Sequence, residues 1–213
     1  MLNFVLLLAS ARAAVCDHPL FSIIAAPPPT DDRHGVATGS GTLDGKDMLG
    51  GRFSLDSAAP FETWRTVLLQ ADNQDEWVPK RFGYEISDWI DREHMYLRFD
   101  IGFLANAVHV KRQLVVAVAN GVVGDRFRTC WRMIDPTPFL PRIADKVSPD
   151  VAWERAATGW WELTPKPGGG VVVNYQWWAE TSMVPSSLVK LGIRTTLPDL
   201  LDAFEERVIA LAP

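Results

Sequence analysis

From Pro185 to Leu211 the chain reads PSSLVKLGIRTTLPDLLDAFEERVIAL. The second half of this segment has the apolar spacing of one buried helical face, at Leu201, Phe204, Val208 and Leu211. The first half has a shorter stripe, out of phase with the later one, at Leu188, Leu191 and Thr195. Because Pro198 lies between the two stripes, the segment predicts either one long helix with a kink or two helices, the second beginning at Thr196.

Most of the chain before this segment predicts strands. Apolar and polar residues alternate with a period of two over residues 82–86, 97–101, 127–133, 159–163 and 171–177. Two short helices precede these strands, over residues 59–69 and 72–77. Consecutive strands joined by short turns favour an antiparallel sheet. Since one face of this sheet is apolar, we expect the C-terminal helix to cover it.

Composition limits the classes of function. The chain of 213 residues is long enough for one well-buried domain, and its apolar content of 47% is typical of a globular protein. The net charge is −5 and no basic stripe is present, which argues against a nucleic-acid partner. The nine tryptophans indicate a Trp-rich core, which is the simpler interpretation, or an apolar cavity with aromatic walls.

The N-terminus has the pattern of an export signal. An apolar run over residues 2–9 is followed by Ala11-Arg12-Ala13, which resembles a cleavage site, although no basic residue precedes the run. We therefore divide the chain into a signal peptide (1–13), an extended arm that can add one edge strand (14–46) and the main domain (47–213). A functional leader predicts a periplasmic or secreted protein, and a non-functional one predicts a cytoplasmic protein.

The two cysteines leave a choice open. Cys16 and Cys130 form no C-x-x-C pair, so neither a zinc site nor a redox motif is indicated. In an exported protein they can form one disulfide, and two unpaired thiols are the alternative.

No catalytic or metal-binding motif stands out. The four histidines lack the spacing of a metal site, and the sequence contains no Gly-x-Ser-x-Gly nucleophile elbow. His109 lies in a strand-like apolar run, where it is either a polar group in a cavity or, more simply, a core histidine. The acidic group at Asp88, Asp91 and Glu93 is read as a solvated turn.

Strand alternation also places the arginines. Arg98 and Arg132 alternate with residues of the covered face, so we expect both on the outer face. A register error of one residue would turn them inward, where they could bind an anionic head group.

Three stretches together resemble the START-like superfamily, also called the SRPBCC or helix-grip group, which includes polyketide cyclases/dehydrases and lipid-transport proteins. The first is Ala59-Pro60-Phe61-Glu62-Thr63-Trp64 with Asp72 and Glu76-Trp77-Val78-Pro79. The second is Gly159-Trp160-Trp161-Glu162-Leu163-Thr164-Pro165 with Gly168-Gly169-Gly170. The third is Val184-Pro185-Ser186-Ser187-Leu188-Val189 with Arg194 to Leu201. The likeness covers about residues 47–211, and its motifs belong to the fold and not to a reaction.

The resemblance implies an α+β helix-grip fold: a curved antiparallel sheet wrapped around a long C-terminal helix, with two short helices after the first strand. It also implies a cavity for a lipid, sterol, polyketide or other apolar ligand. The candidate lining residues are Phe99, His109, Trp131, Trp161, Tyr175, Trp177, Leu188, Leu191, Gly192, Thr195 and Phe204. Gly192 either permits close approach of a ligand or serves helix packing.

The sequence is compatible with three functions. We expect a binding protein or carrier for a hydrophobic small molecule, without cofactor or metal, acting as a monomer with at most a transient membrane contact. The second is a cyclase- or hydratase-type enzyme, which would need buried titratable groups such as His109 with Asp100 or Tyr175. The third is an interaction module whose cavity is filled by aromatic side chains. Catalysis is the less favoured reading.

Overall fold

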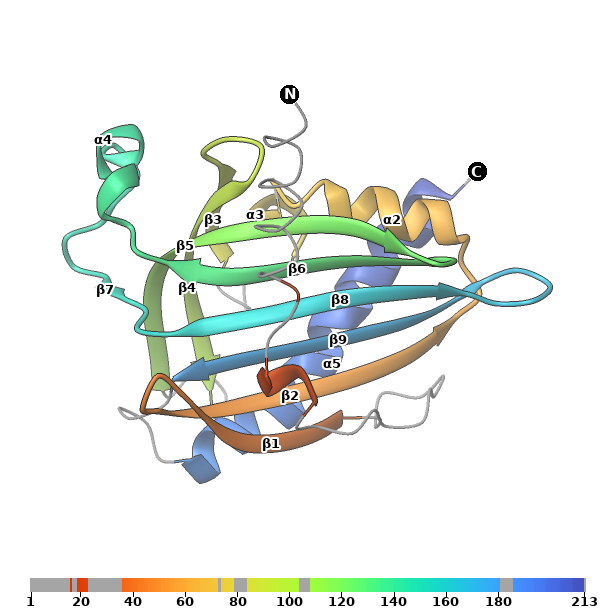
Figure 1. Cartoon of the computed structure of the whole chain (residues 1–213), viewed down its shortest axis with the longest axis horizontal. Coiled ribbons are helices and arrows are strands. Elements are labelled where there is room, and N and C mark those ends of the chain that lie inside the picture. The colour runs from red at the N-terminus through yellow and green to blue at the C-terminus, as the bar shows by residue number, and fades with distance from the viewer. Residues whose placement is uncertain are drawn as a thin grey trace, which may run out of the picture.

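The computed structural model describes residues 16, 19–22, 36–72, 74–78, 84–103, 108–180 and 186–212 (Figure 1). The predicted signal peptide, residues 1–13, lies outside the described residues, as does most of the arm that precedes residue 36.

One sheet dominates the described chain. Its antiparallel strands lie side by side in the order β1-β2-β9-β8-β6-β5-β4-β3, and the two-residue strand β7 pairs parallel with β5. The strands are β1 (Val36–Leu43), β2 (Lys46–Ser57), β3 (Tyr84–Trp89), β4 (His94–Phe103), β5 (Val108–Val123), β6 (Arg126–Ile134), β7 (Ala152–Trp153), β8 (Ala157–Pro165) and β9 (Val171–Glu180). The predicted α+β class and antiparallel sheet are confirmed.

The helices follow the expected order. After β2 come α2 (Phe61–Leu69) and α3 (Gln74–Trp77), and the chain ends with α5 (Ser186–Leu211). Three shorter elements are η1 (Pro19–Ser22), η3 (Thr137–Phe139) and α4 (Leu140–Ile143). Pro198 lies inside α5, so the C-terminal segment is one helix and not two. No helix in the described ranges is long and apolar enough to cross a membrane.

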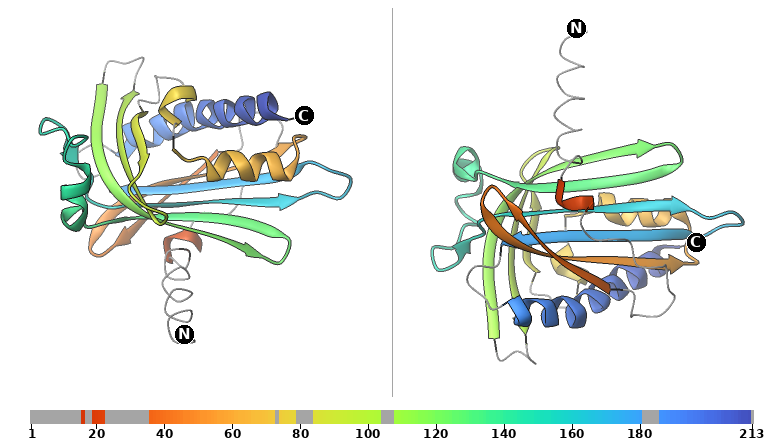
Figure 2. Two further views of the ribbon diagram at one scale, coloured as in Figure 1. Left: turned by 90° about the horizontal axis from the view of Figure 1, so that it is seen from above. Right: turned by 60° about the horizontal axis from the view of Figure 1, so that its bottom comes forward.

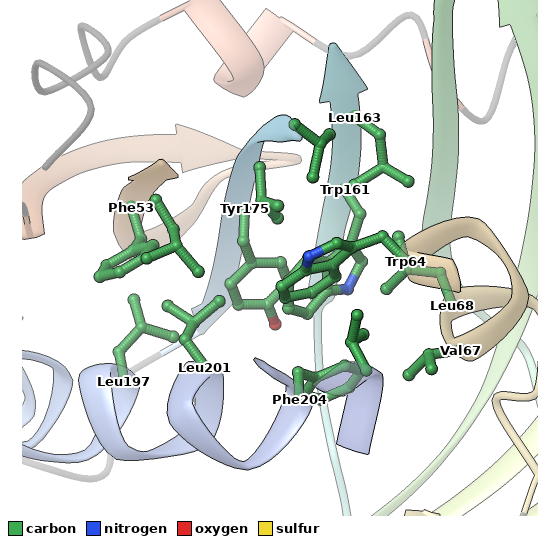
Figure 3. Close-up of a cluster of buried hydrophobic side chains, with 14 of the residues drawn as sticks. Phe53, Trp64, Val67, Leu68, Trp161, Leu163, Tyr175, Leu197, Leu201 and Phe204 are labelled. Atoms are coloured by element: carbon green, nitrogen blue, oxygen red, sulfur yellow. The ribbon is translucent and has the colours of Figure 1, made fainter. Parts of the chain in front are cut away.

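The helix α5 lies on the concave face of the sheet (Figures 1 and 2). Its buried side chains form one stripe that runs through both halves, at Val189, Ile193, Leu197, Leu201, Phe204 and Val208. They join the main core with residues of β2, α2, β8 and β9, such as Phe53, Trp64 and Tyr175 (Figure 3). The predicted stripe through Leu191 is therefore wrong, because the spacing of four from Val189 to Leu201 keeps a single face in phase across Pro198.

A glycine in β2 sets how closely α5 approaches the sheet. A Cβ atom at Gly51 would lie 2.6 Å from Cγ2 of Ile193. Such a distance is shorter than van der Waals contact, so the absence of a side chain at this position lets the helix sit against the strand.

The convex face is covered in two places. Figure 2 shows η1 on the side of the sheet opposite α5 and α2. There Leu20 packs with Met48 and Trp178. A disulfide between Cys16 and Cys130, whose Cα atoms are 5.2 Å apart, ties the segment before η1 to β6. The two cysteines are therefore paired, which is one of the two alternatives that the sequence allowed.

The second cover comes from the segment between β6 and β8. Tyr96 of β4 is fully buried on the convex side, together with Val115 and Ile143 of α4. Its hydroxyl group donates to Oε1 of Gln113 at 2.8 Å and approaches the carbonyl oxygen of Lys146 at 3.1 Å. Tyr96 points to the same face of β4 as Arg98, and no pattern in the sequence indicated that the segment between β6 and β8 folds back over it.

Candidate functional site

A cavity of about 510 Å³ lies between the concave face of the sheet and α5. The strands β3 to β9 form its floor and one end, and α2, α3 and α5 form its remaining walls. Its lining is predominantly apolar, which suits a ligand that prefers hydrocarbon to water.

Strand alternation explains which side chains reach the cavity. On β5 the lining residues are even-numbered, at Val110, Arg112, Leu114, Val116, Val118 and Asn120. On β4 they are odd-numbered, at Met95, Leu97 and Phe99. Because successive strand residues point to opposite faces, residues of one parity on each of these two strands face the cavity, and all of them except Arg112 and Asn120 are apolar.

Aromatic rings form the inner wall. The rings of Trp161 and Tyr175 are stacked with centroids 4.1 Å apart, and Phe204 of α5 lies 4.8 Å from Trp161 (Figure 3). On the neighbouring strand, Trp131 lies over Gly159, where an added Cβ atom would approach its ring to 2.6 Å. The glycine thus gives the Trp131 ring its space beside the cavity.

Six of the eleven predicted residues line the cavity: Phe99, Trp131, Trp161, Tyr175, Trp177 and Phe204. His109 and Leu191 are not among the lining residues. The side chains of Leu188 and Thr195 and the surroundings of Gly192 lie outside the described part of the structure. A role in ligand binding stays a prediction for every residue of this set.

Two placements correct the sequence-based set. His109 is odd-numbered on β5 and therefore points away from the cavity, where its ring nitrogen lies 3.0 Å from Asp100 and its side chain is 49% exposed. Leu191 is 45% exposed on α5, because the buried stripe runs through Val189 and Ile193. A cavity site combining His109 with Asp100 is thereby excluded.

Arg98 and Arg132 lie on the outer face of the sheet, as the alternation of strand residues predicted. Arg98 donates to Glu85 at 2.7 Å and to the carbonyl oxygen of Lys146 at 2.9 Å. Arg132 lies 3.9 Å from Asp44 in the turn between β1 and β2. Neither side chain lines the cavity, so neither can receive an anionic head group there.

Asp91, in the turn between β3 and β4, stabilises the structure through its carboxylate. Burial favours the neutral form of Asp91, but the backbone N–H of Glu93 and the side chains of His94 and Arg142 stabilise its carboxylate and lower its pKa to about 2. Arg142 belongs to α4, so Asp91 links the turn between β3 and β4 to the segment that covers the convex face.

Sequence reasoning missed the charged end of the cavity. All four charged residues of the described lining gather there: Arg112, Glu154, Arg155 and Glu180. Arg112 was detectable, since it is the one charged residue among the even-numbered positions of β5. Glu154 carried no such signal, because it follows the two-residue strand β7 in a stretch without periodicity.

Several contacts hold this end together. The backbone N–H of Glu154 donates to the carbonyl oxygen of Gln113 on β5 at 2.9 Å. Its side-chain Oε1 accepts from the backbone N–H of Arg155 at 2.8 Å. Burial raises the pKa of Glu154 and the charge of Glu180 adds to the rise, whereas the Arg155 N–H and the charge of Arg112 oppose it. Within the described ranges, no group of three or more His, Cys, Asp or Glu side chains is placed to hold a metal ion.

Comparison with known proteins identifies the fold. No protein-family model and no curated protein sequence matches the chain. A STAR-related lipid transfer protein (fragment 25–204) from Xanthomonas axonopodis superposes with a TM-score of 0.63 at 20% identity, over 87% of this chain and 99% of that one. Human StAR-related lipid transfer protein 5 gives 0.64 at 11% identity, over 95% and 96%. A START superfamily protein from Mycobacterium smegmatis gives 0.51 at 16% identity, over 78% and 99%. The chain thus has the START-like, helix-grip fold that its sequence motifs predicted.

Proposed function

From the START-like fold and the cavity that it encloses, we propose that this protein binds one hydrophobic small molecule, a lipid or a similarly apolar compound, between the sheet and α5. The observation that carries the proposal is the cavity of about 510 Å³ with its aromatic and aliphatic walls. Sites for single small molecules commonly measure about 300–1,000 Å³ and are mostly apolar. The names of two structural neighbours, which are called lipid transfer proteins, agree with this in kind.

A probe-displacement titration tests the proposal. An uncharged dye that fluoresces in apolar surroundings is bound to the purified protein and then displaced with apolar compounds. In the matched variant Ala179→Phe, a larger side chain enters the cavity beside Ala157, its neighbour across β8 and β9. We expect dye affinity to fall by about tenfold or more, which corresponds to about 1.4 kcal/mol.

The control for this titration is Ala117→Phe. Ala117 lies on β5 between two cavity-lining residues and therefore points to the opposite face. It should leave dye affinity unchanged. Equal affinity in Ala179→Phe and the wild-type protein would contradict binding in this cavity, and a dye that binds neither would contradict the function as a whole.

The proposed binding does not require a chemical step. A carrier releases its ligand unchanged, so mass analysis of a lipid incubated with the protein should return the starting mass. Conversion of the compound would favour the cyclase or hydratase alternative instead.

We place the protein outside the cytoplasm. The leader-like run at residues 2–9 supports this placement, and so does the disulfide between Cys16 and Cys130, since disulfides persist mainly in oxidising compartments. The intact mass of the protein from the native host should correspond to a chain that begins after Ala13 and carries one disulfide. An uncleaved, reduced protein in the cytoplasmic fraction would contradict the placement.

A further inference from the structure

The two edge strands of the sheet differ in charge. Within the described residues, β3 lies at one end of the strand order and β1 at the other, where it pairs only with β2 (Figure 1). On β3, Glu85 lies 2.7 Å from Arg98, and Asp88 lies 2.8 Å from Lys146. The sequence of β1, VATGSGTL, contains no charged residue and no proline.

This strand lacks the usual protection of a sheet edge. An edge strand carries a row of unpaired N–H and C=O groups that can pair with another chain, and natural proteins block it with charged side chains, prolines or bulges. The register of β1 with β2 runs from Val36 to Leu43 without a shift, so no bulge interrupts it. Neither Gly39 nor Gly41 has a positive φ, so the strand is regular throughout. The outer edge of β1 is therefore suited to accept another strand.

Packing identifies the two faces of β1. Val36 packs against the main core beneath α5, so the even-numbered residues point to the concave side. Ala37 and Leu43 pack with the cluster of Leu20 and Trp178, so the odd-numbered residues point to the convex side. The concave side of this edge thus presents three hydroxyl groups, at Thr38, Ser40 and Thr42, and the convex side presents only glycine and apolar residues.

The middle of β1 is complementary to itself. Its residues Thr38-Gly39-Ser40-Gly41-Thr42 read the same in both directions. If Ser40 lies opposite Ser40 of a second copy in an antiparallel pair, Thr38 lies opposite Thr42, and Ala37 lies opposite Leu43. Hydroxyl groups then meet hydroxyl groups on one face and apolar groups meet apolar groups on the other. Cross-strand pairs of this kind stabilise antiparallel sheets, and the arrangement closes with two-fold symmetry.

We propose that β1 is a self-association surface, through which two copies of this chain pair antiparallel about a two-fold axis at Ser40. The axis is perpendicular to the sheet, so the two sheets become one and both α5 helices lie on the same side of it. Among the described lining residues of the cavity, none belongs to β1, so the association does not depend on the proposed ligand binding. A monomer was the expectation from the sequence, and the unprotected edge argues for a dimer instead.

The size of the contact predicts a weak dimer. Specific interfaces of standard size use about 20–30 residues on each side, and smaller ones belong to transient complexes. The strand β1 contributes eight residues from each copy. We therefore expect a reversible dimer with a dissociation constant of about 10 μM, which is populated only in concentrated solution.

Sedimentation equilibrium of the full chain, from about 1 μM to about 100 μM, measures this association. The average mass of the wild-type protein should rise from one chain towards two. Ser40→Lys places two like charges opposite each other on the axis and should raise the dissociation constant by about tenfold or more. Val122→Lys is the control, because Val122 is 64% exposed at the end of β5 and far from β1 in the strand order. It should associate as the wild-type protein does.

A charge-exchange experiment tests the register and the folding of the variants together. Ser40→Asp alone should also be monomeric, for the same reason as Ser40→Lys. An equimolar mixture of the two should recover the dimer, because opposite charges then face each other across the axis. A misfolded chain could not be rescued in this way, and Ser40 is exposed in the single chain, so neither substitution should disturb the fold.

Three results would overturn the proposal. The first is a wild-type protein that sediments as one chain at every concentration. The second is a wild-type dimer that Ser40→Lys leaves intact, which would place the interface elsewhere. The third is a mixture of the two charged variants that stays monomeric. If a monomeric wild-type protein instead binds an extended peptide of another protein and Ser40→Lys abolishes that binding, the edge serves a different partner and self-pairing is wrong.

Discussion

At the scale of single residues, Gly159 determines the space available to an aromatic side chain of the cavity wall. Its missing side chain leaves room for the Trp131 ring, and an added Cβ atom would also lie 2.7 Å from the carbonyl oxygen of Gln176. A backbone oxygen in a sheet cannot move away easily, so overpacking must be relieved by the tryptophan or by the strands.

Gly159→Ala should therefore lower the free energy of unfolding by about 1–3 kcal/mol and weaken dye binding. Urea unfolding and the dye titration measure the two effects. The matched control is Gly121→Ala, on β5, where nothing lies within 4 Å of the added atom. It should change stability by less than about 0.5 kcal/mol. Similar behaviour of the two variants would contradict the packing assigned to Trp131.

Asp91 predicts a pH dependence of stability. Its pKa falls from 3.8 to about 2 in the folded protein, although burial alone would raise it. A lowered folded-state pKa means that the ionised carboxylate favours the fold above pH 3.8, and that this contribution disappears as the pH falls through about 2.

Asp91→Asn should accordingly be less stable than the wild-type protein at neutral pH, and the difference should shrink between pH 3.8 and about 2. Chemical denaturation at a series of pH values measures it. A difference that stays constant over this range would show that the carboxylate charge is not what stabilises the turn.

At the scale of elements, α5 shows what periodicity can and cannot predict. Its existence and its buried second half followed from helical spacing, except that Leu211, predicted on the buried face with Leu201, Phe204 and Val208, is exposed at the end of the helix. Its continuity did not, because a proline inside a helix removes one backbone donor and packing decides whether the helix tolerates that loss. Val189 and Ile193 on one side of Pro198 and Leu201 on the other bury the same face, so packing holds the helix on both sides.

Leu201→Ala should lower the free energy of unfolding by about 2–5 kcal/mol, because the side chain is only 1% exposed in the main core. Leu191→Ala, on the same helix but 45% exposed, should change it by less than about 0.5 kcal/mol. Thermal or chemical unfolding of the two variants gives the comparison. A large loss in Leu191→Ala would mean that the stripe runs through Leu191 after all.

The disulfide is an element-level feature that no local pattern could reveal. Its two cysteines are 114 positions apart, and the arm that carries Cys16 has no periodicity that would place it on β6. Only the folded sheet brings Cys130 close to Cys16.

Cys16→Ser should lower the free energy of unfolding by about 2–5 kcal/mol, since the bond closes a long loop of the unfolded chain. A reductant should destabilise the wild-type protein by a similar amount and leave Cys16→Ser unaffected. If a reductant leaves the free energy of unfolding of the wild-type protein unchanged, the disulfide is not present or does not stabilise the fold.

At the scale of the whole molecule, the sequence was sufficient to predict the fold. It predicted the aromatic lining of the cavity but not the charged end. The period of two in the strands, the terminal apolar stripe and the three START-like motifs led to the correct fold. Strand alternation also placed Trp131, Trp161 and Tyr175 on the cavity side and Arg98 on the outer side.

The charged end of the cavity depends on contacts that the sequence does not encode locally. Arg112 and Glu154 meet because β7 pairs with β5 in parallel over two residues, a contact too short to leave a pattern. The burial of Tyr96 likewise depends on how the segment around Ile143 folds back. Pairings between distant, irregular segments therefore mark the limit of the prediction.

The central claim is that the space between the sheet and α5 holds one apolar small molecule. Native mass spectrometry of the wild-type protein, loaded with a single-chain apolar compound and compared with Ala179→Phe, tests it most directly. We predict one bound molecule per wild-type chain and a clear loss of that adduct in the variant. Absence of any adduct on the wild-type protein, or equal adducts on both, would contradict the claim.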